Sequence, residues 1–333
     1  MTGRGPRGAT EALLGQPTVA ELRPRYEGSN ICTWIGFKHV SYLVEEAVLE
    51  HFRRADLGAR SLYEDHGLCV DIVELDTRIL HAFHLDDVAV AHVTPTVGPG
   101  DRELALSVEL RVHRASTIRA ATSKVRVVLR DDGEAGPSEL RSGGLARFVV
   151  PRIERAAGDP HRAPEEPRLA GELAWTWRVP YFYCHFSRNL QMSGYLRLME
   201  EVVDLFLAER GISIRTLLEG RRWIPVVPHA AVSMLDEALM EEQLTTVFTV
   251  EDVFKDLTYT ARMDCYVRRE GGLVRTATGR ITHGYAFVAD RCDWALVNFD
   301  EQVLGAVAGA TRAHGEVAGR GTLASEEGPW SRS

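Results

Sequence analysis

One histidine in the second half of the chain stands where acid–base chemistry could take place. His185 comes four residues before Asn189, at the approach to a long apolar stretch that begins near Met192. An imidazole titrates near neutral pH, so it can take a proton from water or from a carbon next to a carbonyl group. A core histidine that donates to a backbone carbonyl is the alternative. We take His185 and Asn189 as candidate catalytic residues.

Two pairs of glutamates interrupt apolar stretches of the chain. Glu45 and Glu46 lie in one stretch, and Glu200 and Glu201 lie in another. A carboxylate on an enclosed helix is costly unless it is paired, exposed or functional. Adjacent helix residues point about 100° apart, so at most one member of each pair can easily face the same neighbour. The alternative is that these glutamates lie on a solvent-exposed helix face.

Amide groups at the predicted helix starts could polarise a carbonyl oxygen. The first N–H groups of a helix have no acceptor one turn earlier and carry partial positive charge. The amides of residues 36–38 and 192–194 are therefore candidate oxyanion donors. Gly36 and Gly194 would let a substrate approach the backbone closely, although both could be turn glycines.

Residues beside these helix starts complete the set of candidates. Phe37 and Tyr195 follow the two glycines directly and are candidate substrate-binding residues. His39 could be a second acid or base in the first half of the chain. Asp204 lies one helix turn beyond Glu200, where an exposed helix end is the alternative.

A histidine pair with nearby aspartates resembles a metal site only in composition. His81 and His84 precede Asp86 and Asp87. Residues three apart on a strand face opposite sides, so the pair is poorly placed to hold one ion. The chain also lacks a G-x-S-x-G elbow, a Walker loop and a dinucleotide-binding glycine pattern. We expect no metal and no cofactor.

The chain repeats itself at a separation of about 155 residues. Three anchors share this register: an arginine- and threonine-containing segment, a glutamate pair, and an acidic pair between them. They are residues 118–125 and 274–281, Glu45-Glu46 and Glu200-Glu201, and Asp86-Asp87 and Glu241-Glu242. An offset this long indicates two copies of one compact domain fused in a single chain. The candidate sites therefore belong to a pseudo-dimer, and the positions where the copies differ matter most.

Composition narrows the function classes. The chain has 333 residues, with 45% hydrophobic and 26% charged residues, which is typical of a globular protein of two ordinary domains. A formal charge of −8 argues against nucleic-acid or anionic-membrane partners. No apolar run reaches membrane-spanning length, and we expect no signal peptide. Five scattered cysteines, none in a C-x-x-C spacing, favour a reduced cytoplasm.

Composition along the chain also predicts its organisation. The predicted order is a disordered tail (1–20), a first domain (21–130), a surface linker (131–171), a second domain (172–312) and a second disordered tail (313–333). The tails are rich in small and polar residues without periodicity, and the linker is rich in Gly and Pro. Within the linker, the apolar patch at residues 148–150 is expected to pin it to a domain.

Both copies are predicted to have the same order of elements. In the first copy these are an extended lead-in (25–33), a helix (38–54) and strands (69–75, 76–84, 88–95, 103–113, 118–130). In the second they are a lead-in (175–185), a helix (192–210) and strands (223–227, 230–239, 244–253, 257–269, 273–288). Short turns such as residues 269–272 favour antiparallel hairpins. The second helix is apolar around most of its circumference, so it is expected to be enclosed.

The segment from Asn189 to Arg197, which continues through Glu200-Glu201 to an acidic-Leu-Phe-Leu tail at residues 204–207, carries a family resemblance. It resembles the 4-hydroxybenzoyl-CoA and enediyne polyketide thioesterases of the hotdog superfamily. Residues 45–50 of copy one show a parallel pattern, although residues 36–39 depart from the family pattern.

A second, local likeness is centred on the same histidine. Cys184-His185-Phe186, followed by Asn189, Met192, Gly194 and Leu196, is similar to the His-Phe segment of β-hydroxyacyl-carrier-protein dehydratases. The histidine of that family is its catalytic base. Its two prolines are absent here, and its helix carboxylate would fall on Met199.

The first resemblance implies an α+β tandem, or double, hotdog fold. In each half an antiparallel sheet would wrap a long central helix. Exposed strand edges need partners, so we expect the two sheets to join into one continuous antiparallel sheet. Both helices would then lie against the same face of that sheet.

Hotdog enzymes take active-site groups from both partners, which predicts how the candidates combine. By the resemblance, His185 of copy two would meet Glu45 or Glu46 of copy one. The reciprocal site would pair Glu200 or Glu201 with Asn30, the copy-one equivalent of His185. An asparagine cannot act as a base. We therefore expect one active site and one degenerate or purely binding site in each chain.

The resemblance implies an acyl-thioester hydrolase that acts on acyl-CoA or an acyl carrier protein, in fatty-acid or polyketide-type metabolism. Two alternatives stay open: a dehydratase acting on a 3-hydroxyacyl thioester, and a non-catalytic scaffold that binds an acyl chain or carrier protein. Neither a nucleic acid nor a membrane is expected as a partner. A homodimer of double hotdogs is a further expectation.

Overall fold

One sheet of 12 strands runs through the part of the chain that the computed structural model describes, which is residues 5–133, 140, 143–155, 172–184, 187–269, 272–290 and 294–308. The first half contributes β1 (Thr18–Leu22), β2 (Leu68–Ile79), β3 (Ala89–Pro95), β4 (Leu104–His113) and β5 (Thr117–Asp131). The second half contributes β7 (Glu172–Arg178), β8 (Trp223–Met234), β9 (Gln243–Phe254), β10 (Thr258–Arg269) and β11 (Gly272–Val288). Two short strands, β6 (Val149–Val150) and β12 (Trp294–Val297), pair with β5 and β11.

The order of the strands is symmetric about the joint between the halves. The sheet runs β1-β3-β4-β5-β2-β8-β11-β10-β9-β7, so each strand of copy one has its counterpart at the same distance from the β2–β8 joint. At the joint, β2 and β8 pair antiparallel from Glu74 opposite Ser233 to Arg78 opposite His229. This arrangement confirms the predicted fusion of two copies into one continuous antiparallel sheet.

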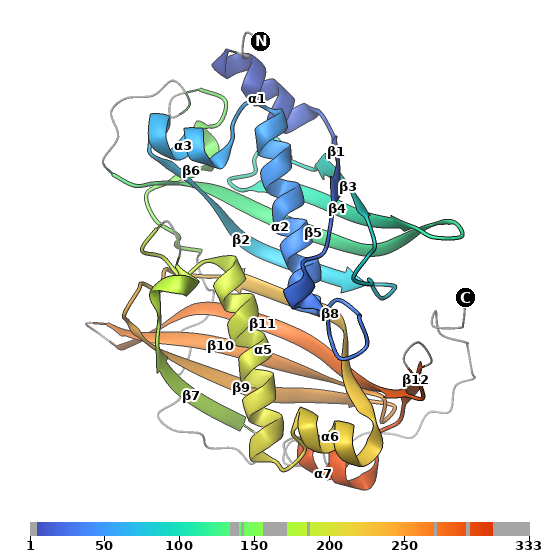
Figure 1. Cartoon of the computed structure of the whole chain (residues 1–333). Helices are drawn as coiled ribbons and strands as arrows, with labels where there is room; N and C mark the ends of the chain where they lie inside the picture. The colour runs from blue at the N-terminus through green and yellow to red at the C-terminus, as the bar shows by residue number, and fades with distance from the viewer. Residues whose placement is uncertain are drawn as a thin grey trace, which may run out of the picture.

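Two long helices cover the same face of this sheet. They are α2 (Phe37–Arg54) and α5 (Met192–Glu209), and Figure 1 shows one in front of each half of the sheet. Their bounds agree with the predicted helices to within one residue at each end. Four shorter helices and three 3-10 turns were not predicted: α1 (Pro6–Gly15), α3 (Ala59–His66), α6 (Ile214–Arg221), α7 (Glu301–Ala308), and the turns at Tyr26–Gly28, Ala146–Phe148 and Tyr181–Tyr183.

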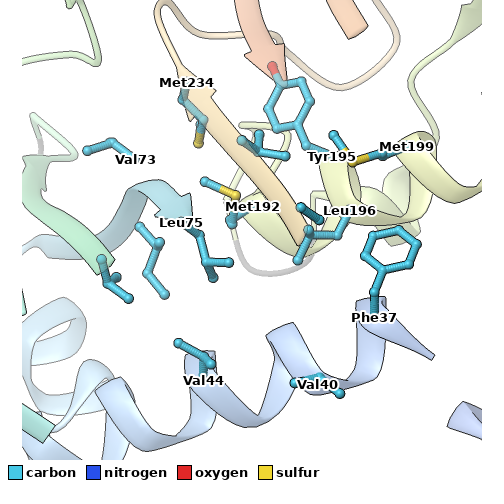
Figure 2. Packing of buried hydrophobic residues seen from close by; sticks show 14 of the residues in the cluster. Phe37, Val40, Val44, Val73, Leu75, Met192, Tyr195, Leu196, Met199 and Met234 are labelled. Atoms are coloured by element: carbon cyan, nitrogen blue, oxygen red, sulfur yellow. The ribbon is translucent and has the colours of Figure 1, made fainter. Parts of the chain in front are cut away.

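The two halves share one hydrophobic core. Figure 2 shows α2 and β2 side chains of copy one facing α5 and β8 side chains of copy two. The labelled residues are Phe37, Val40, Val44, Val73, Leu75, Met192, Tyr195, Leu196, Met199 and Met234. Burial of apolar surface stabilises a fold by about 25 cal/mol per Å², so a shared core ties the halves together. The halves therefore do not swing as separate lobes on the linker.

The predicted division of the first strand in each copy is wrong. Residues 69–75 and 76–84 belong largely to one strand, β2, and residues 223–227 and 230–239 belong largely to β8. The pairing of β2 with β5 shifts register between Ile72 and Glu74, which is a β-bulge. A bulge interrupts the alternation of inward and outward residues without ending the strand. That interruption is why the pattern indicated two strands.

The N-terminal segment is also different from the prediction. Residues predicted as a disordered tail form α1 and the start of β1. Leu13 on α1 is fully buried, and its carbonyl accepts a hydrogen bond from His51 Nε2 at 2.9 Å. The strand that leads into copy one is β1, before the predicted lead-in at residues 25–33. The sequence did not predict helix α1 because the contacts that stabilise α1 come from α2 and not from residues within α1.

The described part of the linker packs against both halves. Phe148 is buried and Val149–Val150 pairs with β5, which confirms the predicted anchoring patch. Arg155 donates to Glu74 and Glu103 of copy one and to the Met234 carbonyl of copy two. The predicted tail at residues 313–333 lies outside the described residues. Among the residues described, no helix is long and apolar enough to cross a membrane.

Candidate active site

A cavity of about 650 Å³ lies at the junction of the two halves. One side is the segment that leads into α2, residues 30–38, and the opposite side is the face of α5 that carries Arg197 and Glu200. Strands β8, β11 and β12 form the remaining walls. Pockets for small ligands usually measure about 300–1,000 Å³. Both copies contribute to this cavity, as a site in a pseudo-dimer requires.

The lining combines apolar residues with polar and charged ones. The apolar residues are Trp34, Ile35, Phe37, Ile79, Val203, Ile214, Val226, Val227, Leu257, Ile281, Trp294 and Leu296. The polar and charged residues are Asn30, Lys38, Thr258, Tyr183, Arg197, Glu200, Glu201, Asp204 and His283. Glu200, Glu201 and Asp204 are exposed, so these carboxylates mark the mouth of the cavity. An apolar chain with a polar head group fits this distribution.

The mouth brings a lysine at the start of α2 into contact with a carboxylate of α5. Lys38 Nζ forms an ion pair with Glu200 across the junction. The Lys38 side chain is only 18% exposed, whereas that of Glu200 is 47% exposed. Of the three carboxylates at the mouth, Glu200 is thus the one that contacts the start of α2.

Two tyrosines, one half-buried and one buried, extend the polar contacts at the junction. Tyr42 donates to the Ser193 carbonyl at 3.2 Å and accepts from Arg197 Nε at 3.1 Å. Tyr183 donates to Glu201 Oε2 at 3.3 Å. Burial raises the pKa of Tyr42 and of Tyr183 to about 12, so both hydroxyls stay protonated and remain donors near neutral pH. Tyr42, Tyr183 and Arg197 were not predicted as site residues, although Arg197 ends the segment from Asn189 that carries the family resemblance.

The start of α2 offers free backbone donors to the cavity. Gly36 is the N-cap residue and makes no side-chain cap. The amides of Phe37 and Lys38 come first in the helix and have no carbonyl one turn earlier to bind. A Cβ on Gly36 would lie 3.3 Å from Asn30 Oδ1, so the glycine lets the Asn30 side chain lie against the helix start.

Asn30 belongs to a tight turn that places it beside the start of α2. The Asn30 amide donates to the Trp34 carbonyl, and Thr33 within the turn has φ 64°. A β-branched residue rarely adopts this left-handed conformation, and such strain gathers at functional loops. Asn30, Gly36 and Phe37, three predicted substrate-binding residues, therefore line one cavity together.

Glu45, at the reciprocal position on α2, lies in a different environment from Glu200. By the repeat, Glu45 corresponds to Glu200, and one of its carboxylate oxygens is buried with no hydrogen-bond partner among the described residues. Burial, and then the neighbouring charge of Glu46, raise the pKa of Glu45 to about 7. Raised carboxylate pKa values are common at sites of acid–base chemistry. The predicted partner of Glu45, His185, lies outside the described residues.

The remaining predicted residues lie away from the cavity. Asn189 is buried beside the start of α5. His39, in the first turn of α2, is buried, and its Nε2 lies 3.3 Å from Glu27 Oε1. Tyr195 is fully buried in the core, and Gly194 packs against Leu190 and the Tyr183 carbonyl with no room for a Cβ. Glu46 is exposed and pairs with Arg53.

The histidine and aspartate group of the first copy has its own partners. The backbone N–H of His84 donates to Asp87 Oδ2, and Asp87 also pairs with Arg114 at 2.7 Å. Arg114 thus neutralises the negative charge of Asp87, which would otherwise be available to bind a metal ion. Within the described ranges, no group of three His, Cys, Asp or Glu side chains is placed to hold a metal ion.

The raised pKa of Glu45 predicts how stability depends on pH. Between the ordinary value of 4.5 and about 7, the folded protein holds a proton that the unfolded chain has released. The free energy of unfolding should therefore fall as pH rises through this interval. Glu45→Gln removes the effect, so at pH 8 the variant should be more stable than the parent by about 3 kcal/mol. At pH 5 the two should be alike in urea unfolding.

Glu46→Gln provides the matched control for this prediction. Glu46 is exposed, and exposed ion pairs contribute about 0–1 kcal/mol. Its charge is the smaller of the two causes of the raised Glu45 pKa, so Glu46→Gln should give only a small part of the stabilisation of Glu45→Gln at pH 8. A Glu45→Gln protein that is no more stable than the parent at pH 8 would contradict the prediction.

Comparison with solved structures identifies the fold. A protein assigned as an oleoyl thioesterase from Lactobacillus plantarum is 13% identical, with a TM-score of 0.56 over 81% of this chain and 96% of that one. The 12:0-ACP thioesterase from Umbellularia californica is 10% identical, with a TM-score of 0.54 over 85% and 98%. An acyl-ACP thioesterase from Bacteroides thetaiotaomicron is 10% identical, with a TM-score of 0.52 over 84% and 100%. No protein-family model and no curated protein sequence matches the chain.

These likenesses cover most of each chain, so the fold they share is the whole double unit. The chain has the tandem hotdog fold that its helix and strand pattern predicted. At 10–13% identity the comparison shows the fold alone. The three neighbours are thioesterases by description, and nothing in the comparisons supports the dehydratase alternative.

Proposed function

We propose that this chain hydrolyses acyl thioesters, with the acyl group bound in the cavity at the junction of its two halves. The observation that carries the proposal is the composition of that cavity. Its walls are apolar, and its mouth sets the free amides at the start of α2 against the carboxylates of α5. The fold, which the chain shares with acyl-carrier-protein thioesterases, adds support by analogy.

The start of α2 would polarise the thioester carbonyl. Hydrolysis passes through a tetrahedral intermediate whose oxygen is negative, and donors aimed at that oxygen lower the barrier. The amides of Phe37 and Lys38 are such donors, and the partial positive charge at a helix start strengthens them. Asn30, which lies against Gly36, would contribute its side-chain amide at the same place.

Glu200 would act as the general base. Its carboxylate, held by Lys38, takes a proton from a water molecule whose oxygen attacks the carbonyl carbon. The carbon–sulfur bond then breaks, and the proton passes from Glu200 to the departing sulfur. The products are a carboxylic acid and a free thiol. The reaction uses only water as a second reactant, so it needs no cofactor.

The carrier of the thioester would lie outside the cavity. CoA and the prosthetic arm of an acyl carrier protein both end in the same thiol, and the open, charged mouth is the side from which this arm would enter. A homodimer of double units remains a prediction from the sequence.

A second candidate site is favoured by the raised pKa of Glu45. There Glu45 would work with His185 and with the first amides of α5, as the sequence analysis predicts. We place hydrolysis at the cavity beside Asn30, which the sequence predicted to be the degenerate site, because Glu200 lines that cavity and Glu45 does not.

The test is a thiol-release assay on purified protein with a series of acyl-CoA thioesters of increasing chain length. Free thiol, measured with a thiol-specific chromogenic reagent, is expected to appear at a rate proportional to enzyme concentration. A 3-hydroxyacyl thioester should give little α,β-unsaturated product. Efficient formation of that product without thiol release would indicate a dehydratase. Neither reaction on a broad panel, including carrier-protein thioesters, would indicate a binding scaffold.

A further inference from the structure

One polar side chain at the closed end of the cavity has no partner. His283 on β11 borders the cavity and is 3% exposed, and its Nδ1 has no hydrogen-bond partner among the described residues. Buried polar groups in folded proteins almost always have a partner, so each exception calls for an explanation. Its neighbours along the lining, Ile281, Val226 and Leu257, are apolar.

Packed aromatic rings hold the imidazole in place. The ring of Tyr259 stacks on it with centroids 5.1 Å apart, and the ring of Tyr285 meets it edge-on at 5.2 Å. The hydroxyl groups of both tyrosines are also buried without partners in the described part of the chain. Neither tyrosine lines the cavity, so His283 is the member of this cluster that a ligand can reach. A half-turn of the ring exchanges Nδ1 with Cδ2, so a nitrogen can face the cavity from either edge.

The distance from the mouth to His283 follows from the strand. A Cβ on Gly279 of β11 would lie 2.5 Å from Met199 Cε, so Gly279 is packed against the α5 residue that precedes Glu200. His283 lies four residues farther along β11. At about 3.3 Å per residue this is about 13 Å. His283 therefore lies about 13 Å along β11 from the residue that packs against Met199, the chain neighbour of Glu200.

The imidazole is neutral under ordinary conditions. Burial lowers the pKa of His283 to about 3, so the ring carries no charge at any pH where the protein would be assayed. A neutral imidazole has one donor and one acceptor nitrogen. It can bind a hydroxyl or a keto oxygen, whereas it offers no charge to compensate a carboxylate.

We propose that the cavity selects an acyl chain that carries a neutral oxygen, a hydroxyl or keto group, about ten atoms from the thioester carbonyl, and that His283 recognises this oxygen. Extended chains advance about 1.2 Å per backbone atom, so about ten atoms span this distance along β11. A plain alkyl chain would remove His283 from water and leave its nitrogen unpaired. Sites built to bond a substrate hydroxyl discriminate against the analogue without it for this reason. The proposal rests on the proposed function only for the thioester end of the ligand.

Binding of neutral alcohols tests the recognition without any hydrolysis. The probes are 1-decanol and 1,10-decanediol, and binding is followed by calorimetry and by quenching of tryptophan fluorescence, since Trp34 and Trp294 line the cavity. The parent protein should bind the diol at least about tenfold more tightly than the alcohol, since a lost hydrogen bond to a buried group costs about that factor. His283→Phe, which keeps a ring on Tyr259, should abolish or reverse this preference.

Two further variants complete the comparison. Tyr285→Phe removes an unpartnered hydroxyl group from the same aromatic cluster, but Tyr285 does not line the cavity. This variant should therefore bind the diol more tightly than the alcohol, as the parent does. His283→Gln keeps a hydrogen-bonding group and should retain part of that preference. Equal or tighter binding of decanol by the parent, or an unchanged preference in a folded His283→Phe protein, would overturn the proposal.

A second measurement separates this proposal from the proposed function. The rate of thiol release is compared for decanoyl-CoA and 10-hydroxydecanoyl-CoA, with an expected preference of about tenfold for the hydroxylated chain. Thiol release without preference for the hydroxyl would overturn the role of His283 and leave hydrolysis standing. Preference for the diol in binding, with no thiol release from either thioester, would refute hydrolysis and leave the recognition by His283 standing.

Discussion

Replacing Glu200 with glutamine is expected to lower kcat/KM for acyl-CoA hydrolysis by about a hundredfold or more, the usual contribution of a general base. Glu200 is the carboxylate that Lys38 brings to the start of α2, where the thioester carbonyl would be polarised. Glutamine has nearly the same shape but cannot accept the proton from water. The measurement is steady-state thiol release by parent and variant on one medium-chain acyl-CoA.

The matched control is the same substitution about 155 residues earlier in the repeat. Glu45→Gln changes the corresponding position of α2 and should alter kcat/KM by less than about threefold, because Glu45 does not line the cavity. The opposite result, a large loss in Glu45→Gln and little in Glu200→Gln, would move the chemistry to the second site. His185→Asn would then be expected to abolish activity as well.

The Glu200 variant should remain folded. The Lys38–Glu200 pair is half-exposed, and such pairs contribute about 0–1 kcal/mol to stability. A thermal melt that coincides with that of the parent would show that lost activity reflects lost chemistry. Full turnover in folded Glu200→Gln protein would contradict its role as the base.

Filling the closed end of the cavity should produce the second large effect. Val226 on β8 lines the cavity and pairs with Gly284, the residue that follows His283. Val226→Trp should exclude about three or four carbons of a long chain. Burial of each CH₂ is worth about 0.8 kcal/mol, so kcat/KM for dodecanoyl-CoA should fall about a hundredfold. For butanoyl-CoA, which does not reach this end, the change should stay within about threefold.

Ser233→Trp is the control for the added bulk. Ser233 is on the same strand but pairs with Glu74 at the β2–β8 joint, outside the cavity lining. This variant should keep the chain-length profile of the parent. Equal losses on short and long chains in Val226→Trp would show that the tryptophan disturbs the active site generally, and the assignment of this end to the acyl chain would then be wrong.

The sequence alone was enough to predict the repeat, the two long helices and the joined sheets. These features are local or periodic. Apolar spacing marks helices α2 and α5 to within one residue, and the shared register of Glu45 and Glu200 reveals two copies of one fold. Two copies with open strand edges bury those edges best by joining them, so the β2–β8 joint also followed.

Features that depend on contacts between distant segments were beyond the sequence. Helix α1 is ordered by contacts with α2, such as the bond between His51 and the Leu13 carbonyl, and its own sequence is too short to form a stable helix alone. The bulge between Ile72 and Glu74 interrupted the alternation on which strand prediction depends. The sequence therefore indicated the right elements with wrong limits.

The candidate site was likewise predictable from the sequence only in part. Residue types and repeat register identified Asn30, Gly36, Phe37 and the α5 glutamates, because these positions are defined by the helix starts and faces that carry them. The sequence predicted their site to be the degenerate one, however, and placed the chemistry at His185 and a glutamate of α2. That Lys38 meets Glu200, and that His283 borders the same cavity, depends on how β11 packs beneath α5. A sequence records which residues share a face of one element. Which faces of different elements meet is decided by tertiary packing, and the cavity lies between such faces.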